Sequence, residues 1–188
     1  MGKIVLASSS PRRSDIMKSL ELDFEKIPSD YVEEHNQTAF SYEYVENLAY
    51  QKALDVAKKV KDKIVIGADT IVVIENKILG KPTDEKEAFK MLSLLSNKKH
   101  FVVTAISIID SNTYEHCTKS TTTYVTFYDL TEEQILSYIK NYKPFDKAGS
   151  YGIQELPDGF VKSIEGDLDN VIGLPTTTLT ELLKNYNL

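Results

Sequence analysis

Residues 63–81 read KIVIGADTIVVIENKILGK, and this stretch predicts the centre of the fold. Its first half is apolar almost without interruption, which is typical of a strand that is buried on both faces. Asn76 stands where the apolar run breaks, so we expect a strand, a turn and a second strand. A carboxylate inside such a strand is costly to bury unless it is paired or bound to a metal ion. Asp69 is therefore a candidate metal ligand or general base, and the alternative is a strand-end Asp that accepts hydrogen bonds from nearby amides.

Two further residues of this stretch bear on a binding site. Gly67 allows the backbone to bend, or allows another group to approach it closely. Lys81 follows Gly80 at the exit of the second strand. If the two strands pair as a hairpin, Asp69 and Lys81 come toward the same end, where a lysine suits a phosphate.

Helical and strand patterns alternate on both sides of this stretch. The apolar and β-branched runs predict further strands over residues 3–7, 23–27, 101–110, 121–130 and 159–164. Helical spacing and capping signals predict helices over residues 11–20, 41–60, 83–95, from 131 onward and over 177–186. The glycine fingerprint of a dinucleotide fold and the GxxxxGK[ST] loop are both absent from the sequence. We therefore expect an α/β protein with a mixed sheet rather than a parallel Rossmann array.

The composition is that of a globular protein of ordinary size. The 188 residues are 41% hydrophobic and 27% charged, so we expect a single domain over residues 1–188. The net charge of −6 disfavours a nucleic acid polymer as partner but permits a small anion in one basic pocket. No run approaches the roughly 20 apolar residues of a membrane span, so we expect no membrane partner and a cytoplasmic location. The single Cys117 excludes an internal disulfide, and the three scattered histidines make no zinc motif.

Residues 8–13 read SSSPRR and contain both arginines of the chain, Arg12 and Arg13. The third serine is expected to cap a helix that begins at the proline, so free backbone amides and the positive end of the helix dipole meet here. Ser8 adds a hydroxyl, and an arginine grips phosphate oxygens in pairs. The stretch therefore favours a phosphate, and the alternative is a capped helix with a solvated arginine pair.

Candidate charged residues also lie in and before the expected helix over residues 41–60. Lys52 falls between Leu48 and Val56 in the apolar pattern, so its ammonium group lies near a buried face and needs an anion there. The alternative is a lysine that reaches solvent along its stem. Glu33 and Glu34 precede the helix and are candidate carboxylates.

Residues 146–175 contain five of the eight glycines, which implies tight turns or close backbone approach. Gln154 has both a donor and an acceptor, as needed to read the edge of a nucleobase. Tyr151 or Phe160 would then stack on that base. The alternative is a set of loop glycines at the edge of a hydrophobic sheet.

Five motifs, LASSSPRR, GADT, GKP, DKAGSYGIQ and VIGLP, stand in an order and spacing that resembles the Maf family. The resemblance implies an α/β fold in which a long, mixed, strongly twisted sheet is flanked by helices in two lobes with a central cleft, as in the inosine triphosphate pyrophosphatases. It implies hydrolysis of nucleoside triphosphates to monophosphate and pyrophosphate with a divalent cation, Mg²⁺ or Mn²⁺. It also implies a homodimer and brings with it a regulatory role in septum formation and cell division.

Three positions separate two branches of the family. Arg12, Thr70 and Gln154 match the branch that resembles dTTP/UTP pyrophosphatases, whereas the branch acting on 7-methyl-GTP has Trp, Gln and Glu there. The chain departs from the family pattern at two places. The acidic pair reads YVEE, of which we favour Glu34 as the functional carboxylate, and YGIQ is followed by Glu155 where Gly is usual.

The resemblance and the residues together predict a role for each candidate residue. Asp69 is expected to be catalytic and, with Glu34, to hold the metal ion. Arg12, Thr70 and Gln154 are expected to select the base, with Thr70 limiting its size. The triphosphate is expected to contact Ser8, Arg13, Lys52 and Lys81.

Three alternatives to this reading stay open. The chain could be a nucleotide-binding regulator of division that does not turn over its ligand. It could be an interaction protein whose arginine pair is merely surface. It could also be a housecleaning enzyme for modified pyrimidine nucleotides.

Overall fold

The structure is a computed structural model that describes residues 3–33 and 39–186. Its strands are β1 (Ile4–Leu6), β2 (Phe24–Lys26), β3 (Ile64–Ile74), β4 (Lys77–Leu79), β5 (Lys99–Asp110), β6 (His116–Phe127) and β7 (Val161–Glu165). Its α-helices are α1 (Pro11–Ser19), α2 (Tyr42–Ala57), α3 (Glu85–Leu95), α4 (Glu132–Tyr142), α5 (Leu168–Ile172) and α6 (Thr176–Leu183). Three short 3₁₀ helices are η1 (Ala148–Ser150), η2 (Ile153–Glu155) and η3 (Lys184–Tyr186). None of the helices in these ranges is long and apolar enough to cross a membrane.

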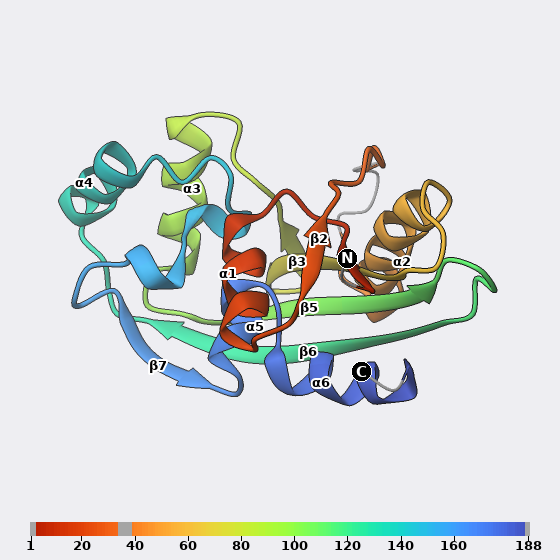
Figure 1. The fold of residues 1–188 in the computed structure, drawn as a ribbon. Coiled ribbons are helices and arrows are strands. Elements are labelled where there is room, and N and C mark those ends of the chain that lie inside the picture. Colours follow the sequence, from red (N-terminus) through yellow and green to blue (C-terminus); the bar gives the residue numbers. More distant parts are fainter. Residues whose placement is uncertain (1–2, 34–38, 187–188) are drawn as a thin grey trace.

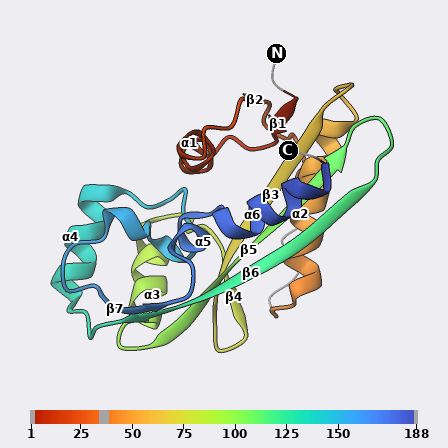
Figure 2. The ribbon, with the colours of Figure 1, turned by 60° about the horizontal axis from the view of Figure 1, so that its bottom comes forward.

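The strands form one seven-stranded mixed sheet in the order β2-β1-β3-β5-β6-β7, with β4 paired to β3. β1 is parallel to β2 and β3, and the other pairs are antiparallel. The long strands β5 and β6 run the length of the molecule, with α3, α4 and β7 gathered at one end (Figure 1). β1, α2 and α6 lie at the other end (Figure 2). The expected α/β fold with a mixed sheet flanked by helices is confirmed.

An opening in the sheet lies along one edge of β3. The opposite edge of β3 is paired with β5 from residue 64 to residue 73. On the open edge, β1 pairs with residues 64–66 and β4 pairs with residues 72–74. Among the described residues, no strand pairs with residues 67–71 on this edge, so Asp69 and Thr70 lie in the gap. Asp69 is therefore in the middle of an 11-residue strand, and the strand-end alternative for it is wrong.

Alternate side chains of β3 point to opposite faces of the sheet. Ile71 packs with Val45 and Ala49 of α2, so Asp69, two residues earlier, faces the same helix. Ala68 packs in the cluster that contains residues of α1 and α6. Thr70, two residues later, therefore faces α1 from the other side of the sheet.

Several helix starts follow the sequence signals. The Ser10 side chain caps α1, whose first residue is a proline, and Thr131 and Gln134 form the expected capping box before α4. At α3 the cap is Asp84 rather than Thr83, because the Thr83 hydroxyl and amide both donate to Glu87. The five-residue α5 was not predicted, since it is too short to show helical periodicity.

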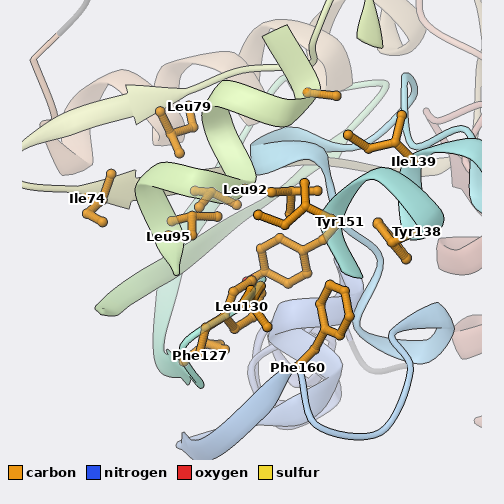
Figure 3. Close-up of a cluster of buried hydrophobic side chains, with 14 of the residues drawn as sticks. Ile74, Leu79, Leu92, Leu95, Phe127, Leu130, Tyr138, Ile139, Tyr151 and Phe160 are labelled. Carbon is orange, nitrogen blue, oxygen red and sulfur yellow. The ribbon is translucent and has the colours of Figure 1, made fainter. Parts of the chain in front are cut away.

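The prediction that Tyr151 or Phe160 stacks on a base is wrong. Both rings belong to the hydrophobic core at the α3 and α4 end of the molecule, where Figure 3 shows them beside Phe127. Tyr151 is 6% exposed and Phe160 is 1% exposed, so both rings are buried against protein atoms. The Tyr151 hydroxyl lies 2.8 Å from Nε2 of His100, which is buried although it ends a run of charged residues. Burial lowers the pKa of His100 to about 4.

Gly67 permits the close approach of α2 to β3, as the sequence suggested. A methyl group at residue 67 would lie 2.6 Å from the backbone nitrogen of Ala53 and 2.8 Å from its Cβ. Gly67→Ala is therefore expected to lower the free energy of unfolding by about 1–3 kcal/mol, the usual effect of overpacking. The measurement is urea unfolding beside Gly80→Ala, whose methyl group meets no atom within 4 Å. Equal stability of the two variants would contradict the close packing of helix on strand.

Candidate functional site

A cavity of about 920 Å³ lies at the opening of the sheet. This volume is at the upper end of the range of typical small-molecule sites. Its walls come from the turn after β1, the start of α1, the buried side of α2, the middle of β3 and the loop after α4. Its lining includes residues that the sequence singled out, among them Ser8, Arg12, Arg13, Glu33, Lys52, Asp69, Thr70, Lys81, Tyr151 and Gln154.

The Lys52 ammonium group joins two carboxylates at the centre of this cavity. Its Nζ lies 2.5 Å from Oδ1 of Asp69 and 2.6 Å from Oε1 of Glu33. The expectation that Lys52 meets an anion near the buried face of its helix is confirmed. Burial raises the pKa of Asp69, and the nearby Glu33 carboxylate adds to this rise, although Lys52 and Arg13 act against it. A carboxylate with a raised pKa is well suited to accept a proton.

Glu33 shares the Lys52 ammonium group with Asp69. The sequence favoured Glu34, which lies outside the described residues. Glu33 lines the cavity, and the segment that carries it has no regular secondary structure. Because such a segment has no periodicity, the sequence gives no signal for the direction of the Glu33 side chain.

Arg13 is held by three protein acceptors at the side of the cavity. Its Nε donates to the Gly173 carbonyl at 2.9 Å, and its two terminal nitrogens donate to Ser8 Oγ at 3.1 Å and Thr70 Oγ1 at 3.0 Å. Burial lowers the pKa of Arg13, and the Asp69 carboxylate opposes this effect. These contacts fix the plane of the guanidinium group next to Asp69 and bring Thr70 to Arg13.

The lining of the cavity also includes Arg12, Gln154 and Lys81. Arg12 pairs with Asp146 at 3.2 Å, in the loop that leads to Gln154. Gln154 is exposed in the short helix η2, and Lys81 is exposed two residues after β4. Arg12 and Gln154 thus belong to one side of the site, while Thr70 lies with Arg13 and Asp69.

Two aromatic residues of the cavity were missed from the sequence, Tyr31 and Tyr44. Tyr44, Leu48 and Lys52 stand four residues apart on α2 and all line the cavity. This spacing is a signal that could have identified Tyr44. Burial raises the pKa of the Tyr44 phenol, and the Glu33 and Asp69 carboxylates raise it further.

Asp55 anchors the segment before Glu33 to α2. Its Oδ2 accepts from the Ser29 hydroxyl at 2.9 Å, from the Asp30 amide at 2.8 Å and from Lys59 at 2.9 Å. Burial would raise the pKa of Asp55, but these hydrogen bonds outweigh it and lower the pKa. The helix that carries Lys52 thereby also positions the chain that leads to Glu33.

Comparison with known proteins agrees with this architecture. The family model described as Maf-like protein matches residues 3–186. The chain belongs to the Maf family. Membership in the Maf family agrees with the mixed sheet and with the order of the motifs along the chain.

Its curated relatives in the Maf family match it over nearly their whole length. A protein of Ruminiclostridium cellulolyticum is 45% identical over 188 residues, which cover 100% of this chain and 97% of that protein. A protein of Thermoanaerobacter sp. is 47% identical, with 97% of this chain and 95% of that protein covered. A protein of Bacillus cereus is 45% identical, with 100% and 97% covered. All three are named dTTP/UTP pyrophosphatase.

Proposed function

We propose that this chain hydrolyses dTTP and UTP to the nucleoside monophosphate and pyrophosphate. The observation that carries the proposal is the convergence of Asp69, Glu33 and Lys52 beside Arg13 in one cavity. Acidic and basic groups from distant parts of the chain meet there, as cleavage of a polyanion requires. The names of the full-length relatives support the same substrates.

The carboxylate pair fits a divalent cation. Oxygens of Asp69 and Glu33 lie 2.5 Å and 2.6 Å from one ammonium nitrogen, so their surroundings favour positive charge. Mg²⁺ and Mn²⁺ prefer oxygen ligands and are commonly held by one or two carboxylates together with substrate phosphates. We propose that Asp69 and Glu33 would hold such an ion. When bound, it would supply charge neutralisation for the phosphates.

The residues of the cavity have distinct roles in the proposed reaction. Asp69 accepts the proton of a water molecule that attacks the α-phosphorus, because its raised pKa suits a base. The bond between the α-phosphorus and the bridging oxygen breaks, and pyrophosphate leaves with that oxygen. Lys52, Arg13 and Lys81 stabilise the negative charge on the phosphates, and the Ser8 oxygen, which accepts from Arg13, leaves its own hydroxyl hydrogen to donate to a phosphate.

The base is proposed to bind at the rim formed by Arg12 and Gln154. Gln154 offers a donor and an acceptor to the edge of a pyrimidine, and Arg12 lies across the same side of the cavity. Thr70 stays a predicted specificity residue, and its hydroxyl, which accepts from Arg13 and lies 2.9 Å from the Thr104 hydroxyl, belongs to the Arg13 side of the cavity.

A panel of triphosphates tests this function. Pyrophosphate release is measured with dTTP, UTP and 7-methyl-GTP, in the presence of Mg²⁺ or Mn²⁺. We expect dTTP and UTP to be cleaved faster than 7-methyl-GTP. Comparable or faster cleavage of 7-methyl-GTP would refute the assignment to the dTTP/UTP branch. Binding of dTTP without release of pyrophosphate would instead support a non-catalytic nucleotide regulator.

We propose, on the family resemblance, that the chain acts in the cytoplasm as a homodimer. Light scattering of the purified protein measures its mass, and a mass of one 21.2 kDa chain would contradict the dimer.

A further inference from the structure

A chain of alternating charges runs along the base side of the cavity. Asp146 accepts from Arg12 at 3.2 Å through one oxygen and from Lys147 at 2.7 Å through the other. The Lys147 ammonium group also lies 3.2 Å from Oε2 of Glu155. Arg12 is thus connected through Asp146 and Lys147 to Glu155, the residue that directly follows Gln154.

Lys147 is buried, which is unusual for a lysine. Its side chain is 8% exposed and runs directly under Gly152, where an added methyl group would lie 2.8 Å from Cε. Oε2 of Glu155 is also buried, and within the described part of the chain no hydrogen-bond donor satisfies it. The ammonium charge 3.2 Å away therefore offsets the cost of burying this oxygen.

The ion pair closes a loop that is also held at several points before Gln154. The Gly149 amide donates to the Gly80 carbonyl at 3.0 Å, and the Gly152 amide donates to the Tyr138 hydroxyl at 3.1 Å. Both contacts come before Gln154. The Glu155 side chain, which reaches back to Lys147, fixes the turn on the far side of Gln154.

We propose that Glu155 and Lys147 are positioning residues that hold Gln154 and Arg12 ready for the nucleobase. The proposal rests on the proposed function, because it assigns these residues to the base end of that same site. Glu155 touches no reacting atom and acts through the loop. A loop that is ordered before binding loses less conformational entropy when the ligand binds, so the pair raises affinity for the base-bearing substrate.

Glu155→Gln tests the proposal by removing the charge at nearly unchanged volume. We expect KM for dTTP and UTP to rise about two- to tenfold, the effect of ordering one or two side chains, with kcat within about twofold of the parent. The inhibition constant of inorganic tripolyphosphate, which has no base, should stay unchanged. Glu165→Gln is the matched control. Glu165 on β7 forms an exposed ion pair with Lys99 on β5, and neither residue lines the cavity.

Glu155→Gly provides a second variant if Glu155→Gln does not fold. It should raise KM in the same way and also leave tripolyphosphate inhibition unchanged. Lys147→Met combined with Glu155→Gln should raise KM no more than Lys147→Met alone, because both changes break the same contact.

Three outcomes would overturn the proposal. The first is an unchanged KM of Glu155→Gln for both substrates. The second is a loss of tripolyphosphate binding as large as the rise in KM. The third is a double variant whose rise in KM is the product of the rises in Lys147→Met and Glu155→Gln. None of these three outcomes would contradict the proposed function, which fails only if the parent protein itself releases no pyrophosphate from dTTP and UTP.

Discussion

Asp69→Asn is expected to lower kcat for dTTP by about 10²- to 10⁴-fold, the range that a positioned general base contributes. The amide keeps the shape of the side chain but cannot accept the proton of the attacking water. It also removes one of the two carboxylates that face Lys52 at the centre of the cavity. The measurement is pyrophosphate release at saturating dTTP.

The control for Asp69→Asn is Asp15→Asn, which removes an exposed carboxylate on α1 whose partner is Lys18. Asp15→Asn should keep full activity, and both variants should show the circular dichroism spectrum of the parent. If Asp69→Asn retains a near-normal rate, Asp69 is not the catalytic base.

Lys52→Met should damage both activity and stability. It removes the cation that lies between Glu33 and Asp69 and leaves two mostly buried carboxylates facing each other. Breaking a buried ion pair in this way costs about 3–5 kcal/mol of unfolding free energy. The loss of a positive charge beside the phosphates should lower kcat/KM by about 10²- to 10³-fold. Chemical denaturation and steady-state kinetics give the two quantities.

Lys119→Met is the matched control for Lys52→Met. It breaks an exposed ion pair with Glu181, for which a change of less than about 1 kcal/mol is typical. Mg²⁺ should stabilise Lys52→Met more than the parent, since the variant has two carboxylates without their lysine. Equal stability of Lys52→Met and Lys119→Met would show that Lys52 does not hold the acidic pair together.

The sequence predicted those parts of the site that lie on regular elements. Asp69 stood out because a charged residue interrupts a buried strand, and Lys52 stood out because it interrupts an apolar helical stripe. The ion pair between Asp69 and Lys52 gives each of these buried charges the opposite charge that it needs. Helix caps at Ser10 and Thr131 were equally predictable, because a cap depends only on neighbouring residues.

Features that depend on distant contacts were beyond the sequence. The position of Asp69 in a gap depends on where β1 and β4 stop pairing with β3, and no local pattern specifies this. The three acceptors of Arg13 come from segments up to 160 residues away. Tyr151 and Phe160 were assigned to a base because they are aromatic and lie near glycines, yet packing with α3 and α4 buries them.

Hydrolysis of dTTP in water enriched with ¹⁸O tests most directly the claim that water in this cavity attacks the α-phosphorus of the triphosphate. We predict that one atom of ¹⁸O appears in thymidine monophosphate and none in pyrophosphate, because the water attacks the α-phosphorus. Label in pyrophosphate or in orthophosphate, detected by mass spectrometry of the products, would contradict that prediction.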